Sequence, residues 1–391
     1  MCNVIKICFV TTIGGTIKIF ILKLAQFLYE TGEFDISFIC SPDDELEKAT
    51  PEYIHIFPVP MERGISLGGL KSAFQIWNIF RKEKFDIIQY STPNASCYAS
   101  IGAWLVRTKV RLYCQWGIVY VGFEGLKRII FKLEEKMVCR LSSWIEPDSK
   151  SNLDFSHKEG LYPYWKGSVV WNGSASGVDL TRFDISKKKA YNAKIREKYG
   201  IPENDFVFGF VGRITADKGI NELFAATKDF FLEHEDAWLV LVGASELSND
   251  VDNNLFNWAE KSERVIFVGY TSVVEQYIAT MDCFILPSYR EGFGMSVVEA
   301  EAMGVPVIVS NIPGPIDGMI NNKTGLIIPK KDSGALKMAM EKVFTSPELC
   351  IEFGENGQKF ASDNFEQNEL FKKILMDRKE LLFSGKPNKK I

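Results

Sequence analysis

Apolar residues along this chain fall into short runs that alternate with longer amphipathic stretches. The first run, Val4–Val10, is followed by the turn Gly14-Gly15 and by apolar residues at helical spacing over Ile17–Tyr29. The run Phe206–Val211 is followed in the same way by Gly212-Arg213 and a helical pattern. A strand, a glycine turn and a helix open a βα unit, so the pattern predicts one such start in each half of the chain.

Ten further apolar runs follow these two starts, five in each half, and helical patterns separate them. Valine, isoleucine and phenylalanine are frequent in these runs, which cover 35–40, 53–58, 86–90, 110–114 and 144–146, then 238–242, 265–268, 283–286, 305–310 and 325–328. Short β-rich runs separated by helices predict parallel sheets with helices on both faces. We therefore expect an α/β protein built from Rossmann-like domains.

Breaks in this pattern indicate where the domains end. A length of 391 residues is typical of two or three domains, and the glycine–serine turn Gly173–Gly177 with the polar helix after it separates the halves. We expect a first domain over residues 1–175 and a second over 176–363. A last helical segment over 364–391 is expected to pack back onto the first domain.

Composition and charge exclude some functions and point to one kind of partner. Apolar residues make up 46% of the chain and charged residues 25%, an ordinary globular balance, and the net charge of −4 argues against a nucleic-acid binder. Residues 63–140, however, hold 13 Lys and Arg against 5 Asp and Glu. This local surplus indicates either an anionic partner, such as a phosphate or a membrane surface, or solvated helix faces.

The cysteines and the chain start bear on the cellular compartment. Eight cysteines are scattered without a C-x-x-C pair or zinc-ligand spacing, so we expect reduced thiols in a cytosol. The chain start reads as a strand and lacks the cleavage site of a signal peptide. No run reaches the ~18 apolar residues of a spanning helix. A cytoplasmic protein is expected, with any membrane contact peripheral.

The segment Glu291–Glu299 carries the clearest chemical signal. Its glycine loop runs into a helix that the pattern places from Ser296 to Met303, and such a loop offers free backbone N–H groups to a diphosphate. The two carboxylates suit vicinal hydroxyls of a sugar and a ribose, because each accepts two hydrogen bonds. The alternative for Glu299 is a capping box with Ser296, in which the glutamate only satisfies the helix start.

Glu291 and Glu299, with seven residues between them, resemble the E-x7-E motif of retaining family 4 glycosyltransferases. The segments 300–308 and 322–326 continue that likeness. Phe210–Gly219 resembles the segment in which the family's Arg and Lys hold the donor diphosphate, although a solvated basic pair is the alternative. Asn172–Phe183 resembles the entry to the second domain in the branch that builds bacterial surface polysaccharides from UDP-sugars.

This resemblance implies a GT-B fold, with two parallel sheets facing across a cleft. It implies transfer of a sugar, with retained configuration, from a nucleoside diphosphate to a saccharide in capsule, O-antigen or exopolysaccharide synthesis. A UDP-sugar is expected rather than a GDP-sugar, and a polyprenyl-diphosphate-linked acceptor is expected, with no cofactor and no metal. The residues implied are Glu291, Arg213 and Lys218 in catalysis, and Gly14, Gly15, Gly212, Phe293, Gly294, Met295, Ser296 and Glu299 in donor binding.

The acceptor side departs from the family's pattern, since many members carry a histidine where this chain has Gln115 and Trp116. Gln115 either donates a hydrogen bond to a sugar hydroxyl or is simply a polar loop residue. The basic, apolar helix Gly125–Met137 either docks on the anionic inner face of the cell membrane or packs into the core.

Some alternatives stay open at this point. Asp250-Val251-Asp252 fits a metal-binding D-x-D pattern but does not end an apolar strand, so we interpret it as surface loop carboxylates. A sugar-nucleotide epimerase of similar fold and a catalytically silent scaffold partner remain rival functions. A dehydrogenase is disfavoured, because neither glycine turn contains a G-x-G-x-x-G fingerprint.

Overall fold

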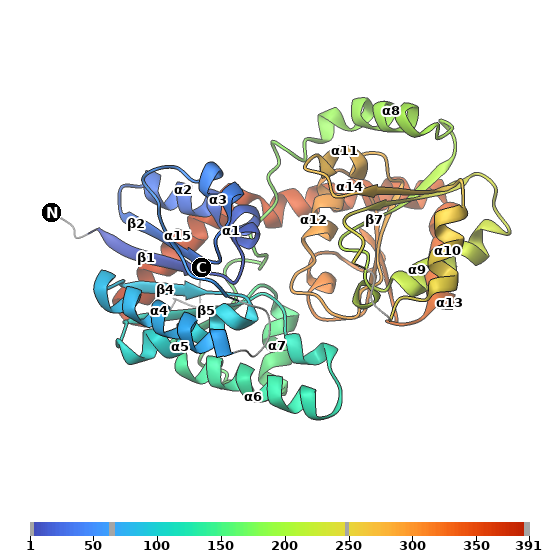
Figure 1. The fold of residues 1–391 in the computed structure, drawn as a ribbon. Coiled ribbons are helices and arrows are strands. Elements are labelled where there is room, and N and C mark those ends of the chain that lie inside the picture. The colour runs from blue at the N-terminus through green and yellow to red at the C-terminus, as the bar shows by residue number, and fades with distance from the viewer. Residues whose placement is uncertain (1–3, 62–66, 247–249, 387–391) are drawn as a thin grey trace. The chain divides into compact units, whose positions relative to one another are not determined.

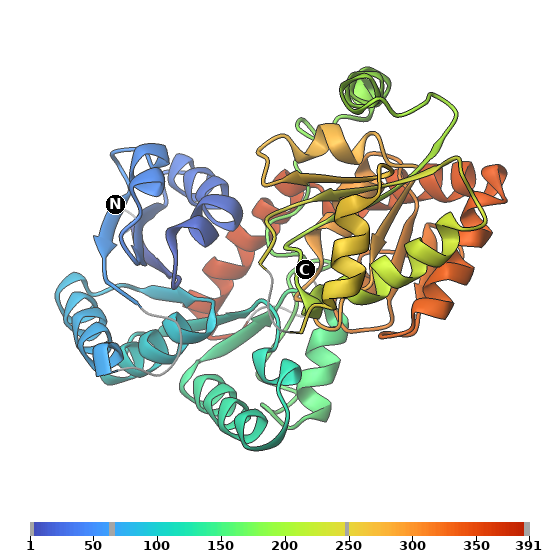
Figure 2. The same ribbon diagram turned by 45° about the vertical axis from the view of Figure 1, so that its right-hand side comes forward.

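The computed structural model describes residues 4–61, 67–246 and 250–386, which form two compact units. The first unit combines Met1–Ser176 with Asn368–Ile391, and the second is Gly177–Gln367. Each is a six-stranded parallel sheet with helices on both faces (Figures 1 and 2). The prediction of two Rossmann-like folds is therefore confirmed. The chain changes unit after residues 176 and 367, compared with the expected boundaries at 175 and 363.

In the first unit the strands lie in the order β3-β2-β1-β4-β5-β6, and all neighbours are parallel. These strands are β1 (Ile5–Val10), β2 (Phe34–Cys40), β3 (His55–Pro58), β4 (Ile87–Tyr90), β5 (Val110–Gln115) and β6 (Trp144–Pro147). Its helices are α1 (Gly14–Phe20), α2 (Leu22–Glu30), α3 (Asp44–Ala49), α4 (Leu67–Glu83), α5 (Pro93–Leu105), η1 (Val119–Gly122), α6 (Gly125–Leu141), α7 (Lys150–Lys158) and α15 (Gln367–Ser384).

The second unit repeats this arrangement in the order β12-β11-β10-β7-β8-β9. These strands are β7 (Phe206–Val211), β8 (Ala237–Val242), β9 (Val265–Gly269), β10 (Cys283–Leu286), β11 (Val307–Ser310) and β12 (Gly325–Ile328). Its helices are η2 (Ile185–Lys187), α8 (Lys188–Tyr199), η3 (Ala216–Lys218), α9 (Ile220–Phe231), α10 (Asn253–Lys261), α11 (Val274–Ile278), α12 (Met295–Ala302), η4 (Pro315–Asp317), α13 (Ser333–Phe344) and α14 (Pro347–Phe365).

The predicted strands all occur within two residues of their expected bounds. The central strands β1, β4, β7 and β10 are buried on both faces, as in a sheet covered by two helix layers, and Phe208 of β7 and Phe284 of β10 are fully buried. The edge strand β3 is partly exposed. Burying each such ring contributes roughly 1.5–3 kcal/mol. The stretch predicted as one helix over 17–29 instead forms α1 and α2, because the backbone at Ile21, with φ −118°, interrupts it.

In both sheets the strand order reverses once. The chain builds β1, β2 and β3 in one direction and then returns to place β4 on the other side of β1; β7 and β10 are related in the same way. The connections after these two strands therefore leave in opposite directions, which opens a space at their carboxyl ends. In each sheet, a ligand is therefore expected at the carboxyl ends of the two strands on either side of this reversal.

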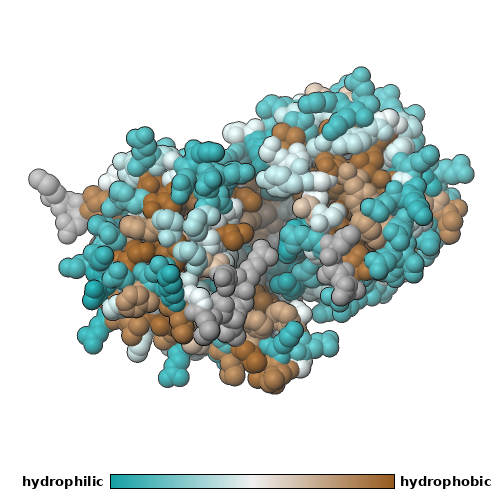
Figure 3. Space-filling model, in the orientation of Figure 1, coloured by the Kyte–Doolittle hydropathy of each residue, from teal (hydrophilic) through white to brown (hydrophobic). Residues whose placement is uncertain are grey.

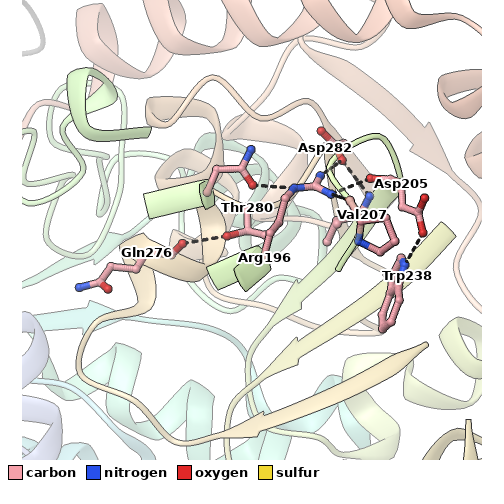
Figure 4. Close-up of polar contacts among 9 residues, drawn as sticks. Arg196, Asp205, Val207, Trp238, Gln276, Thr280 and Asp282 are labelled. Carbon is pink, nitrogen blue, oxygen red and sulfur yellow. Dashed lines mark hydrogen bonds and ion pairs between the residues drawn. The ribbon is translucent and has the colours of Figure 1, made fainter. Parts of the chain in front are cut away.

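A buried arginine on α8 holds the amino ends of β7 and β10. Figure 4 shows Arg196 donating to Asp282, 3.0 Å away, which also accepts the Val207 N–H at 2.8 Å. Arg196 also donates to the backbone carbonyl of Asp205 at 2.9 Å, and the side chain of Asp205 accepts from Trp238. Because Asp282 precedes β10 and Asp205 precedes β7, this cluster fixes the two strands on either side of the reversal.

The last helix, α15, belongs to the first unit. Leu370, Phe371 and Ile374 are buried in the same core as β1 and β2. Arg378 is only 1% exposed. Both of its Nη atoms donate hydrogen bonds to Glu146 of β6, one of them at 2.9 Å. It also donates to Asp377 at 2.6 Å and to Gln89 of β4 at 3.1 Å. Burial raises the pKa of Asp377 to about 7, although the charge of Arg378 lowers it.

The cysteines in the described parts of the chain form no disulfide. Seven cysteines are free thiols, and Cys2 lies outside the described residues. Burial raises the pKa of the Cys114 thiol well above its usual range, so that thiol is unreactive. Among residues 4–61, 67–246 and 250–386, no helix has both the length and the apolar character needed to cross a membrane.

Replacing Arg378 by alanine should destabilise the first unit strongly. The variant leaves the carboxyl groups of Glu146 and Asp377 without their cation, which costs about 3–5 kcal/mol in buried pairs. Urea unfolding followed by circular dichroism measures this loss. The control Lys379→Ala removes a partly exposed pair with Glu33 and should cost less than about 1 kcal/mol. Equal losses in the two variants would show that the Arg378 cluster does not hold α15 in place.

Candidate active site in the second unit

Two loops meet at the reversal of the second sheet, one after β7 and one after β10. The first loop carries Arg213 and η3, and the second carries Glu291. Gly219, at the end of η3, has φ 74°, and a Cβ atom there would lie 2.0 Å from the carbonyl oxygen of Pro287. Only glycine fits this contact. The close approach brings the side chains of the two loops together.

Lys218 and Glu291 form the centre of this arrangement. The Nζ of Lys218 lies 2.6 Å from Oε1 of Glu291, and the hydroxyl of Ser288 donates to the same oxygen at 2.7 Å. The two side chains are 18% and 11% exposed, so water screens the pair only partly. The structure thus brings together two of the three residues expected in catalysis.

A second set of contacts locks the two loops to each other. Arg290 lies 3.0 Å from Asp217, Thr215 donates to Asp217 at 2.6 Å, and the Tyr289 N–H donates to the Asp217 carbonyl. Burial alone would raise the pKa of Asp217, but the Thr215 hydrogen bond and the Arg290 charge bring it below its usual range. The sequence analysis missed these residues. Their only signal is that they neighbour Lys218 and Glu291.

Arg213 lies apart from this pair. Its Nη1 atom is 2.7 Å from Oε2 of Glu246, and the two side chains are 47% and 49% exposed. Within the described residues, Arg213 makes no hydrogen bond or ion pair with Lys218 or Glu291. The third residue expected in catalysis is therefore held in a solvated ion pair with Glu246. Gly212, between β7 and Arg213, contributes only backbone.

The glycine loop enters α12 differently from the expected capping box. Gly294, with φ 83°, is the N-cap of α12, and as a glycine it has no side chain to cap the helix. Ser296 therefore lies inside the helix, and the capping interpretation of Glu299 is wrong. Phe293 is buried against Phe365, so its ring packs in the core and only its backbone can face a ligand beside the helix start.

A third loop supports this glycine loop from behind. Gly314 has φ 102°, and a Cβ atom there would lie 1.9 Å from the carbonyl oxygen of Gly292. Pro315 lies next to Gly294, 3.2 Å from the position of a Cβ atom there. The loop after β11 thus sets the course of the glycine loop. The sequence analysis did not single out these residues, because the contact joins segments that are separate in the chain.

Glu299 is a desolvated carboxyl group without a bonded donor among the described residues. Burial raises its pKa to about 7; the charge of Arg182 lowers the pKa and that of Glu275 raises it. Arg182 itself donates to Glu275 at 2.9 Å and to the Ser272 carbonyl at 2.8 Å. A carboxyl group with a raised pKa and unused acceptor atoms is typical of a ligand-binding position.

A second glutamate on the same helix has a different character. Glu301 is 0% exposed, and neither of its carboxyl oxygens has a hydrogen-bond partner in the described parts of the chain. Burial raises its pKa well above the usual range. Its side chain faces α14 near Gly357. Glu301 is therefore a neutral core residue, and Glu299 is the glutamate of α12 that remains available to a ligand.

In the first unit, Gly14 and Gly15 lie at the start of α1, after β1. Gly14 packs against Asp43, and Gly15 has open space where a side chain would be. Thr92, which follows β4, was missed: it has φ 70°, rare for a β-branched residue, and its hydroxyl bonds both the N–H and the hydroxyl of Thr12. Strained Thr92 marks the reversal of the first sheet.

The expectation that Gln115 contacts a sugar is corrected. Gln115 is 0% exposed, donates to Glu135 at 2.5 Å, and accepts from Ser156 at 2.9 Å. Gln115 thus provides a hydrogen bond to the buried carboxyl group of Glu135. Burial raises the pKa of Glu135 to about 7. Trp116 is partly buried, and its ring lies 5.7 Å from that of Phe20 in the core of the first unit.

The D-x-D pattern has a structural role. Asp252 is the N-cap of α10 and accepts from Asn254 N–H at 2.8 Å and Leu255 N–H at 3.1 Å. Asn221 of α9 accepts the Asp252 N–H and donates to the carbonyl of Asp250. These contacts agree with the interpretation of the pair as loop carboxylates; that catalysis needs no metal stays a prediction.

Comparisons with known proteins match both units. The family model described as glycosyl transferases group 1 matches residues 192–360, and the model described as glycosyl transferase 4-like matches residues 6–144. A capsular polysaccharide biosynthesis glycosyltransferase of Staphylococcus aureus, CapM, is 30% identical over 87% of this chain and 88% of its own length.

Two further matches agree with this result. An α-1,3-galactosyltransferase of Escherichia coli, named for UDP-Gal and α-D-GlcNAc-diphosphoundecaprenol, is 28% identical over 84% of this chain and 85% of its own. The solved structure of Anabaena HepE in complex with UDP and glucose matches with a TM-score of 0.76 at 19% identity. It covers 95% of this chain and 98% of that one, and it shows the shared GT-B fold.

The pKa of Glu299 predicts a measurable effect on stability. Because folding raises this pKa from its ordinary value near ~4.3 to about 7, the folded protein binds the proton more tightly. Stability from this group is therefore present at low pH and is lost as the pH rises through that window. Urea unfolding gives the free energy of unfolding of the variant Glu299→Gln and of the parent chain. The variant's value minus the parent's should be larger at pH 8 than at pH 5. Glu246→Gln, at an exposed carboxylate, should show no such difference, and an equal response of both would contradict the assignment.

Proposed function

This chain belongs to the family 4 glycosyltransferases, and we propose that it transfers a sugar from a UDP-sugar to a lipid-linked saccharide with retained configuration. The observation that carries this proposal is the pair Lys218–Glu291, held 2.6 Å apart at the reversal of the second sheet. On the adjoining helix lies Glu299, to which no group in the described part of the chain donates a hydrogen bond. A cation, an oriented carboxylate and a free glutamate beside helix N–H groups are the parts that a nucleotide-sugar site requires.

Each residue has a definite task in this proposal. The ammonium group of Lys218 stabilises the negative charge that grows on the leaving diphosphate. Arg213 is exposed and exchanges its bond to Glu246 for a two-point contact with phosphate oxygens. The bonds from Lys218 and Ser288 both end on Oε1 of Glu291, which leaves Oε2 to accept from a hydroxyl of the donor sugar. Glu299 accepts from the ribose hydroxyls.

The chemical step needs no nucleophile from the protein. The acceptor hydroxyl oxygen bonds the anomeric carbon on the face from which the diphosphate leaves, through an oxocarbenium-like transition state. The bond from the anomeric carbon to the phosphate oxygen breaks, and that oxygen takes the proton of the acceptor hydroxyl. Configuration is retained because attack and departure share one face. The protein contributes position and charge stabilisation.

The donor, the acceptor and the process are proposed from the relatives. The galactosyltransferase named above uses UDP-Gal and a diphosphoundecaprenol-linked acceptor, and the S. aureus relative acts in capsule biosynthesis. These names support a UDP-sugar rather than a GDP-sugar, and a polyprenyl-diphosphate-linked saccharide in surface polysaccharide synthesis.

We also propose peripheral contact with the inner face of the cell membrane, through α6. The core interpretation of this helix fails for four apolar side chains, here called the α6 stripe: Leu126 is 72% exposed, Ile129 57%, Ile130 43% and Leu133 62%. Figure 3 shows hydrophobic atoms gathered over α6 and over the neighbouring α4 and α5. Lys127 and Lys136 flank the stripe, and an apolar stripe edged by cations suits an anionic lipid surface.

The two rival functions differ from transfer in what they release. An epimerase of similar fold would free or convert a UDP-sugar without any acceptor, whereas a transferase releases UDP in proportion to added acceptor. A silent scaffold partner would bind without turnover. A thermal-shift screen of UDP-glucose, UDP-galactose, UDP-N-acetylglucosamine and GDP-mannose, followed by UDP release with and without a polyprenyl-diphosphate sugar, separates all three.

Lys218→Ala and Glu291→Gln should each lower the rate of transfer by about 100-fold or more, the usual effect of removing one charge-stabilising group. Measuring UDP release at saturating acceptor gives this rate. The control Lys337→Ala removes a similar Lys–Glu contact, with Glu233 at 2.6 Å between α13 and the end of α9, and should keep full activity. Near-normal turnover in Lys218→Ala would show that the site is assigned wrongly.

A double variant Leu126→Ser and Leu133→Ser should bind anionic membranes more weakly. Sedimentation with vesicles of phosphatidylglycerol and phosphatidylcholine, compared with phosphatidylcholine alone, measures this binding. Each lost leucine removes buried apolar area worth roughly 1.5–3 kcal/mol, so the partition coefficient should fall at least about tenfold. Leu232→Ser, at an isolated leucine that is 81% exposed in the second unit, serves as the control. Unchanged sedimentation of the double variant would exclude the α6 stripe as the contact.

A further inference from the structure

A groove of about 630 Å³ lies in the first unit, between the last turn of α6 and the loop that follows α7. We call it the aromatic groove and define it by Lys136, Arg140, His157, Tyr164, Trp165 and Lys166. Because α6 ends directly before β6 begins, the groove lies at the amino end of β6. The reversal of the first sheet and its strained Thr92 lie at the opposite, carboxyl ends of the strands.

The loop that forms one wall of the groove is firmly held. Lys166 donates to the carbonyls of Cys139 and Arg140 at 2.6 and 3.0 Å, which satisfies acceptors at the end of α6. Gly167 forms an isolated parallel bridge with Ile145 of β6. The ring of His157 packs 4.3 Å from that of Tyr164. The wall is therefore preformed rather than created by a ligand.

Two aromatic rings on this rigid wall remain exposed to water, Tyr164 by 73% and Trp165 by 58%. The Nζ of Lys386 lies 5.5 Å from the centre of the Trp165 ring. Exposed aromatic rings held in place add little to the folded core, but they offer flat surfaces on which the C–H faces of pyranose rings can stack. The volume of the groove falls within the ~300–1,000 Å³ of small-molecule sites.

The charge of the groove is positive. Of the residues that line it, none is acidic, and neither the ammonium of Lys136 nor the guanidinium of Arg140 has an acidic partner among the described residues. On the same helix, by contrast, Lys132 pairs with Glu159. Unpaired cations around a hollow attract anions, and a guanidinium can bind a carboxylate or phosphate at two points.

We infer that the aromatic groove binds an acidic saccharide, with sugar rings on Tyr164 and Trp165 and the carboxylate or phosphate on Lys136 and Arg140. A membrane surface fits less well, since lipid contact favours protruding apolar groups such as the α6 stripe, whereas this site is hollow. The groove would hold an acidic glycan chain at the amino end of β6, whereas the reversal of the first sheet lies at the carboxyl ends of β1 and β4. The inference does not depend on the proposed transfer activity.

Calorimetric titration of the full chain with two matched probes tests this inference. A hyaluronan tetrasaccharide, which carries glucuronate, should bind at least about tenfold more tightly than neutral chitotetraose, and added salt should weaken it. Trp165→Ala and Arg140→Ala should each weaken binding about tenfold. Trp104→Ala, at a tryptophan that is 53% exposed on α5, should leave it unchanged.

The outcomes against the inference are distinct. Equal affinity for the two probes, no binding of the acidic probe at millimolar concentration, or full binding by both groove variants would each overturn it. If Arg140→Ala instead lowers sedimentation with phosphatidylglycerol vesicles while the acidic probe does not bind, the groove is a lipid site. Trp165→Ala should keep the parent rate of transfer, and Lys218→Ala should still bind the acidic probe, so a failure of the transferase assignment would leave this result intact.

Discussion

The reversal of strand order between β7 and β10 is the constraint on which the candidate site depends. In a parallel sheet the connections after these two strands must leave in opposite directions, so no helix covers the carboxyl ends between them. Lys218 and Glu291 lie in the two loops that flank this gap, and they meet because Gly219 lets one loop touch the Pro287 carbonyl of the other. Arg196, at the far ends of the same strands, keeps them in register.

The fold could be predicted from the sequence because the central strands are buried on both faces. A strand such as β10 must then be apolar throughout, and its pattern marks its own ends. Local patterns were less informative where distant contacts decide the geometry. Ser296 and Glu299 fit a capping box, yet the helix begins one residue earlier, because Gly314 supports the Gly292 carbonyl and directs the chain into Gly294.

The site itself could be predicted only in part. Lys218, Glu291 and Glu299 were expected from the resemblance that their segments carry, and the structure brings Lys218 and Glu291 into contact. Gln115 was misjudged because its partners, Glu135 and Ser156, lie 20 and 41 residues further along the chain. Asp217 and Arg290, which join the two loops, match no motif or spacing in the sequence that would point to them. Such residues are recognised only when the loops are seen together, since the contacts that they make join one loop to the other.

The position of α15 has a consequence for how the protein is made. Arg378 bonds Gln89, which is 289 residues earlier in the chain, and completes a core that otherwise consists of the first strands to be synthesised. On the ribosome, the second unit therefore has all of its segments available before the first unit does. The first unit must wait, with the surface that α15 covers still exposed, until α15 has been synthesised. A nonsense mutation just before the codon of Arg378 would thus harm the half of the molecule that was synthesised first.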